Sequence, residues 1–102
     1  MNYRFDYRDS FWQDYFSALD YIANVLENRN AAHELDTEFE RVKRSLRIFP
    51  RASRPYLSPP FVDSDYYALP VKNYLAFYVV LGDVVEFRRF LYSRADLRNR
   101  LK

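Results

Sequence analysis

The longest run of basic side chains in the sequence has a composition that could bind the phosphates of a nucleic acid. It lies between residues 41 and 54 and is followed by Tyr56. Cations pair with phosphates while bases stack on aromatic rings, so this mixture suits single-stranded RNA. The alternative is that the charges form only the solvated face of an amphipathic helix. The basic residues of the run are Arg41, Lys43, Arg44, Arg47, Arg51 and Arg54.

Residues for several other kinds of chemistry are scarce. His33 is the only histidine, and it lies off the apolar stripe of its segment, which predicts a surface position rather than a catalytic one. The chain has no cysteine and one glycine. A metal cluster needs several His or Cys ligands, and a phosphate-binding loop needs several glycines. We therefore expect no metal site, no cofactor, no nucleotide-binding fold and no Ser/His/Asp hydrolase.

The charges are unevenly distributed along the chain. The net charge is +2, but residues 1–40 carry −6 and residues 41–102 carry +8. Such a chain can present one acidic and one basic surface, and the basic one would suit a nucleic acid or an acidic protein segment. The alternative is that the two halves neutralise each other in the folded protein.

Length and composition indicate one domain, residues 1–102, built around a modest core. The chain contains 10 Tyr, 9 Phe and 1 Trp, more aromatic surface than so small a core can cover, so some rings are expected to face a partner. No apolar run approaches the ~20 residues of a membrane span, and the N-terminus has no apolar signal core. We expect no membrane association and a cytoplasmic location.

Hydrophobic periodicity predicts a short strand and then an amphipathic helix. Residues 3–8 alternate apolar and polar, which places Tyr3, Phe5 and Tyr7 on one face of the strand. In residues 11–26, apolar side chains recur every three or four positions, as on one face of a helix. The predicted stripe consists of Trp12, Phe16, Leu19, Ala23 and Leu26, with Ile22 beside it.

Ser10 and Gln13 have the spacing of a capping box at the start of this first helix. A second helix follows it closely. After a break at residues 28–30, the apolar positions of the second helix continue until Pro50 ends it. Helices joined by so short a link are expected to pack as an antiparallel hairpin. The stripe of the second helix is Ala32, Leu35, Phe39, Val42, Leu46 and Phe49.

The rest of the chain is predicted to form strands. Four prolines between residues 50 and 65 indicate an extended loop. Three β-rich runs, 66–69, 74–81 and 84–92, follow with tight connections, which indicates an antiparallel meander. Residues 94–101 can add a helical turn. The predicted class is α+β, with the order β-α-α-β-β-β and the helix hairpin packed on one face of an antiparallel sheet.

Three segments, in this order, resemble the RelE/ParE toxin family over nearly the whole chain. The first runs from Tyr21-Ile22-Ala23 through Asn28, Asn30, Ala31 and Ala32 to Leu46, Phe49 and Pro50. The second is Leu69-Pro70-Val71-Lys72-Asn73-Tyr74-Leu75-Ala76-Phe77-Tyr78-Val79-Val80, similar to a hairpin of the family. The third is Arg89-Phe90-Leu91-Tyr92-Ser93-Arg94-Ala95-Asp96, similar to the family's C-terminal strand.

The resemblance implies the toxin of a bacterial type II toxin-antitoxin system, held inactive by a cognate antitoxin. The family contains ribonucleases that cut mRNA on the ribosome and ParE-like members that poison DNA gyrase. The ribonucleases usually have an Arg directly after the hairpin Tyr and often a Tyr or His near the C-terminus. This chain has Leu75 at the first position and Leu101 and Lys102 at its end. These departures favour a ParE-like toxin that acts on gyrase by binding.

The ParE-like interpretation assigns two groups of residues to partners. The exposed aromatic residues would receive an amphipathic antitoxin segment, either as a helix in a groove or as an added strand. The antitoxin-binding candidates are Tyr66, Tyr67 and Tyr92. The target-binding candidates are Arg94, Arg98, Arg100, Arg51 and Arg54.

Two functional alternatives remain open. A metal-independent ribonuclease, with the ribosome and mRNA as partners, would use Arg89 and Arg94 to bind a phosphate and Tyr92 to move a proton. The structural alternative for the same residues is that Tyr92 packs at the sheet edge and the arginines are solvated or paired with Asp96. The second functional alternative is an interaction module that has the shape of the family but no toxicity.

Overall fold

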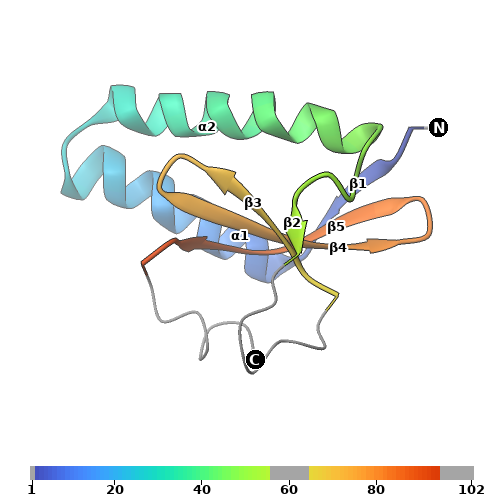
Figure 1. Cartoon of the computed structure of the whole chain (residues 1–102). Helices are drawn as coiled ribbons and strands as arrows, with labels where there is room; N and C mark the ends of the chain where they lie inside the picture. Colours follow the sequence, from blue (N-terminus) through green and yellow to red (C-terminus); the bar gives the residue numbers. More distant parts are fainter. Residues whose placement is uncertain (1, 56–64, 95–102) are drawn as a thin grey trace.

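Five strands form one mixed sheet, which Figure 1 shows. The structure is a computed structural model, and it describes residues 2–55 and 65–94. The strands lie in the order β1-β5-β4-β3-β2. Their bounds are β1 Arg4–Tyr7, β2 Arg54–Pro55, β3 Tyr67–Val71, β4 Tyr74–Leu81 and β5 Val84–Tyr92.

The predicted meander is confirmed, and two further strands extend it. β3, β4 and β5 are antiparallel neighbours. The β4–β5 hairpin turns at Gly82. Its φ of 60° lies in the left-handed region, which glycine adopts without the steric strain that a side chain would cause. β1 pairs with β5 in parallel, so the sheet is mixed rather than antiparallel throughout. β2, from the segment expected to be mostly extended loop, pairs with β3 at the opposite edge.

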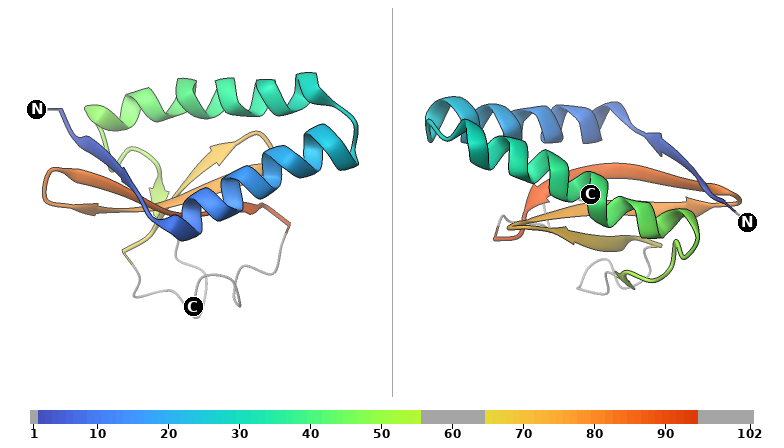
Figure 2. Two further views of the ribbon diagram at one scale, coloured as in Figure 1. Left: turned by 180° about the vertical axis from the view of Figure 1, so that it is seen from behind. Right: turned by 90° about the horizontal axis from the view of Figure 1, so that it is seen from above.

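The predicted helix hairpin is also confirmed. Helix α1, Asp9–Asp20, continues into one turn of π-helix, Tyr21–Val25. Helix α2, Arg29–Lys43, continues into a 3₁₀ turn, Arg44–Arg47. Figure 2 shows the two helices side by side and antiparallel. At the start of α2, the Asn28 side chain accepts a hydrogen bond from a backbone amide of the first turn.

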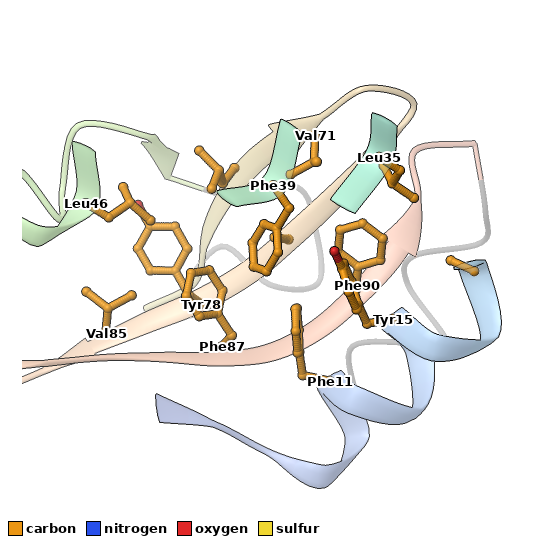
Figure 3. Close-up of a cluster of buried hydrophobic side chains, with 13 residues drawn as sticks. Phe11, Tyr15, Leu35, Phe39, Leu46, Val71, Tyr78, Val85, Phe87 and Phe90 are labelled. Atoms are coloured by element: carbon orange, nitrogen blue, oxygen red, sulfur yellow. The ribbon is translucent and has the colours of Figure 1, made fainter. Parts of the chain in front are cut away.

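The main core lies between the helix hairpin and one face of the sheet (Figure 3). Phe11 is fully buried, and its ring centroid lies 5.6 Å from that of Phe39, 5.5 Å from that of Phe87 and 5.8 Å from that of Phe90. The core therefore depends on aromatic contacts between both helices and β5. Its buried residues are Phe11, Tyr15, Ala18, Leu35, Phe39, Leu46, Leu69, Val71, Ala76, Tyr78, Val85, Phe87 and Phe90.

The face of α1 that enters the core is not the predicted one. The buried residues of α1 are Phe11, Tyr15 and Ala18. The predicted stripe begins one residue later, about 100° further round the helix, and its Phe16 is 59% exposed. Its last member, Leu26, is 55% exposed. Helix α1 thus carries two adjacent apolar stripes, of which one is buried in the core and the other packs against the core only in part.

Two polar side chains of α1 hydrogen-bond to β5 beyond the end of β1. The Ser10 hydroxyl donates to the Arg88 carbonyl at 2.7 Å. The Phe90 amide donates to the Asp14 carboxylate at 3.0 Å. Side chains of α1 therefore satisfy backbone groups that would otherwise form an open sheet edge. The predicted capping box is wrong, because α1 begins before Ser10 and its N-cap makes no side-chain hydrogen bond.

Two further expectations concern the ends of segments. Phe49 was expected in the stripe of the second helix, but it lies beyond the 3₁₀ turn and is exposed. The helical segment ends before Phe49. Pro50, the next residue, is buried, and its carbonyl accepts a hydrogen bond from the Tyr78 hydroxyl at 2.7 Å. The expected helical turn over residues 94–101 lies outside the described residues, except for Arg94.

Candidate interaction surfaces

A groove of about 610 Å³ runs between α1 and α2. The residues of its α1 wall are spaced by three or four positions, so they lie along one face of that helix. They are Trp12, Phe16 and Leu19 of α1 and Ala23 of the π-helical turn that continues it, four of the five members of the predicted stripe, together with Asp20. The residues from α2 are Ala32, His33, Asp36, Phe39 and Glu40, and Tyr15 also lines the groove.

A hydrogen bond between two of the lining residues connects the two walls of the groove. The Tyr15 hydroxyl of α1 donates to the Asp36 carboxylate of α2 at 2.5 Å. Tyr15 is almost fully buried. Burial, with the added hydrogen bond and charge of Asp36, raises the pKa of the Tyr15 phenol well above its ordinary value of 10.0. The spacing of the helices is therefore fixed by a directional contact as well as by apolar packing.

Replacing Tyr15 by phenylalanine should reduce the loss of stability at alkaline pH. The folded-state pKa is raised, so the stabilising contribution of the phenol is complete below about pH 10 and is lost as the pH rises further. Y15F cannot ionise, although it loses a hydrogen bond worth about 1 kcal/mol at neutral pH. Urea unfolding at about pH 8 and about pH 11 measures both effects, with exposed Tyr21→Phe as the control. Equal alkaline losses in the parent and Y15F would contradict this expectation.

The groove is acidic. Among the described residues that line it, Asp20, Asp36 and Glu40 are acids, and none is Lys or Arg. Glu40 pairs with Lys43 at 2.8 Å, whereas Asp20 accepts a hydrogen bond from the neutral Asn24. The net negative charge therefore rests on Asp20 and Asp36.

The charges of the two halves of the chain neutralise each other only in part. Asp14 pairs with Arg89 at 2.6 Å, and Glu86 pairs with Arg8 at 2.8 Å. Most acids of the helix hairpin make no such pair within the described residues. The hairpin thus keeps an acidic surface, as one of the two interpretations of the charge distribution expected.

The basic run of residues 41–54 does not form a continuous phosphate-binding strip. Arg41 binds Glu38 through two hydrogen bonds of 2.8 Å. Lys43 is only 6% exposed, and its ammonium group donates to the Tyr7 hydroxyl at 2.8 Å. The Arg47 guanidinium lies 4.3 Å from the centroid of the Phe5 ring. Arg44 and Arg51 are exposed, the side chain of Arg54 is not described, and Tyr56 lies outside the described residues.

Two of the candidate ribonuclease residues, Arg89 and Tyr92, are not brought together. Arg89 donates to Asp14 at 2.6 and 3.0 Å, a partner that no local pattern in the sequence indicated. Asp96, the partner considered in the structural alternative, lies outside the described residues. Arg89 is in register with Phe77, on the sheet face that points away from the helices. Tyr92 lies three residues later on the same strand and contacts Tyr74, so it emerges on the opposite face.

The aromatic antitoxin candidates differ in accessibility. The ring of Tyr67 stacks on that of Tyr78 at 5.4 Å, on the core side of the sheet. The ring of Tyr66 packs edge-on against Phe77 at 6.3 Å. Tyr92 is 42% exposed. Of these three candidates, Tyr92 offers the most surface to a partner.

The basic target-binding candidates are only partly within the described residues. Arg94 is exposed directly after the last strand, and Arg51 is exposed between α2 and β2. Arg98 and Arg100 lie outside the described residues.

His33 lies at the groove, exposed as predicted. Within residues 2–55 and 65–94, no group of three or more His, Cys, Asp or Glu side chains could hold a metal ion. No helix in this part of the chain is long and apolar enough to cross a membrane.

Comparisons with known proteins agree with this architecture. A solved structure, described as the chromosomal ParDE TA system from P. aeruginosa, is similar with a TM-score of 0.69 over 88% of this chain and 95% of that one, at 18% identity. A search among curated proteins finds no match. Residues 5–97 match the family model described as the ParE toxin of the type II toxin-antitoxin system parDE. The chain therefore belongs to the ParE toxin family.

Proposed function

We propose that this chain inhibits bacterial growth by binding DNA gyrase in the cytoplasm and is neutralised by a cognate antitoxin. The observation that carries action by binding is the placement of the candidate catalytic groups. Arg89 is held by Asp14, and the Tyr92 side chain emerges on the other face of the sheet. A phosphate held by Arg89 would therefore not reach the Tyr92 hydroxyl, although general acid or base catalysis requires hydrogen-bond distance.

The C-terminal arginines are the proposed target-binding surface. Arg94 is exposed, and Arg98 and Arg100 follow it in the sequence. Arginine binds carboxylates and phosphates through two parallel hydrogen bonds, so such a cluster suits an acidic protein surface or DNA held by an enzyme. Arg51 and Arg54 are proposed as a secondary contact.

Tyr92, at the C-terminal end of β5 and two residues before Arg94, is proposed to contact the antitoxin. Tyr92 is half-exposed and contacts Tyr74. A tyrosine in this position can bury a large ring against a partner while its hydroxyl stays hydrogen-bonded. Tyr66 would contribute less, because it packs against Phe77, and Tyr67 least, because it stacks on Tyr78.

Supercoiling by purified gyrase tests the proposed target. The parent protein should inhibit the reaction, and the variant R94A/R98A/R100A should need at least about tenfold more protein, since three surface charge contacts together contribute about 1.5 kcal/mol or more. R29A/R41A/R44A removes the same charge from α2 and the 3₁₀ turn that follows it, and it should retain the parental potency. Equal potency of R94A/R98A/R100A and the parent would show that these arginines are not the target-binding surface.

A further inference from the structure

The outer stripe of α1 is an apolar surface that the described residues cover only in part. Its residues at the groove are Trp12, Phe16, Leu19 and Ala23, and Phe16 is more than half exposed. The rings of Trp12 and Phe16 stack on each other, with centroids 5.4 Å apart, so the wall they form is continuous. Contiguous exposed apolar surface on a small protein indicates a binding surface.

The shape of the groove fits a helix. From Trp12 to Ala23 the α1 wall is roughly 16 Å long at 1.5 Å per residue, which corresponds to about three turns of a partner helix. The groove is also lined by the small residues Ala23 and Ala32, which leave space for a bulky side chain. Both walls are helices whose backbone groups are bonded internally, so the groove offers no open edge to an added strand.

The charge of the groove further restricts which partner helices could bind. Asp20 and Asp36 border the apolar lining, and within residues 2–55 and 65–94 no Lys or Arg lines the groove. Along the hairpin from Asp9 to Glu40, the sequence has eight acidic residues and one arginine. A segment with acidic flanks would be repelled here, whereas one with basic flanks would be attracted.

We propose that this groove binds an amphipathic helix of about three turns that is rich in Lys and Arg. The apolar stripe of that helix enters between α1 and α2, and its cations pair with Asp20 and Asp36. The proposal rests on the proposed function in one respect, namely that the cognate antitoxin would carry this helix.

The fluorescence of Trp12 provides a direct readout, because Trp12 lines the groove and is the only tryptophan of the chain. The full chain is titrated with a synthetic helix of about 18 residues that has a leucine stripe, lysine flanks and neither Trp nor Tyr. We expect a saturable change in emission that weakens as salt is added. A matched peptide with Glu in place of each Lys should bind at least about tenfold more weakly. No response to the lysine peptide, or equal binding of both peptides, would overturn the proposal.

Variants locate the charge effect. D20N/D36N removes both groove charges, and its amide oxygen at position 36 can still accept the Tyr15 hydrogen bond. It should bind the lysine peptide about fivefold to tenfold more weakly than the parent, as expected for two surface ion pairs. E27Q/E34Q removes two acids of the same hairpin that do not line the groove, and it should change the affinity less than about twofold. Equal losses in the two variants would mean unspecific attraction and would overturn the proposal.

The same titration distinguishes other occupants. If Trp12 emission changes with protein concentration alone while a dimer forms in sedimentation, the occupant is a second copy of the chain. If a peptide of residues 94–102 binds more tightly than the designed helix, the occupant is the chain's own end. Either result would overturn the proposal. Since this binding is measured without gyrase, failure of the groove proposal and failure of the proposed target are separate outcomes.

Discussion

Replacing Phe11 by alanine should lower the free energy of unfolding by about 4 kcal/mol, whereas F16A should lower it by less than about 1 kcal/mol. Phe11 is fully buried and contacts rings of α2 and β5, so its removal leaves a cavity that the surrounding rings cannot fill without moving. Phe16 is more than half exposed on the same helix, where its ring stacks on that of Trp12 and lies edge-on to that of Tyr15. Urea unfolding followed by circular dichroism measures both values.

The pair of variants also separates stability from binding. F16A should keep the fold and yet weaken the binding of the lysine-rich helix, because Phe16 is part of the groove wall. Phe11 lies on the core side of α1, so F11A is the matched phenylalanine control. If F16A destabilised the protein as much as F11A, the outer stripe would be part of the core and the assignment of the two stripes would be wrong.

Replacing Asp14 by alanine should lower the free energy of unfolding by about 3 kcal/mol. The Asp14 carboxylate accepts two hydrogen bonds from Arg89 and one from the Phe90 amide. Both charged side chains are mostly buried, and removal of one partner of such a pair leaves the other charge poorly solvated. The variant also removes the acceptor of a backbone amide at the edge of β5.

Two controls separate these contributions. D14N keeps an oxygen acceptor but not the charge, so it should fall between the parent and D14A. D9A removes an exposed acid from the same helix and should change stability by less than about 0.5 kcal/mol. If D14A matched D9A, the contacts of Asp14 would not stabilise the junction of α1 and β5. Thermal and urea unfolding of the three variants provide the comparison.

Local patterns in the sequence predicted most of the elements. The alternation of Tyr3, Phe5 and Tyr7 predicted β1, and these rings do pack against the core. The spacing of Leu35, Phe39 and Leu46 predicted the buried face of the second helix. In both segments only one face is apolar, so the pattern specifies both the element and its orientation.

The orientation of α1 could not be predicted in this way. Phe11, Tyr15, Ala18 and Ile22 have the same helical spacing as the stripe that begins at Trp12. Two stripes offset by one residue are equivalent in the sequence, and only the positions of β5 and α2 decide which of them is buried. The second stripe was nevertheless a signal, because a helix that is apolar over two faces requires a second contact surface.

The parallel pairing of β1 and the partner of Arg89 depend on contacts distant in the sequence. Arg89 and Asp14 are 75 residues apart, and no local pattern indicates that α1 crosses the end of β5. The π-helical turn and the bulge of β5 near Arg88 likewise follow from how the elements meet. Charge pairs of this kind are set by tertiary packing, whereas pairing with Asp96 was an alternative based on a neighbour in the sequence, and Asp96 lies outside the described residues.

The most direct test of the central claim is to induce the chain in a bacterium without its antitoxin and to follow DNA and protein synthesis by pulse labelling over the first minutes. A toxin that acts by binding gyrase predicts that DNA synthesis falls first, and that R94A/R98A/R100A delays the fall. If protein synthesis falls first, the chain acts on translation, and the ribonuclease alternative with Arg89, Tyr92 and Arg94 replaces the proposal. If neither falls, the chain is an interaction module without toxicity.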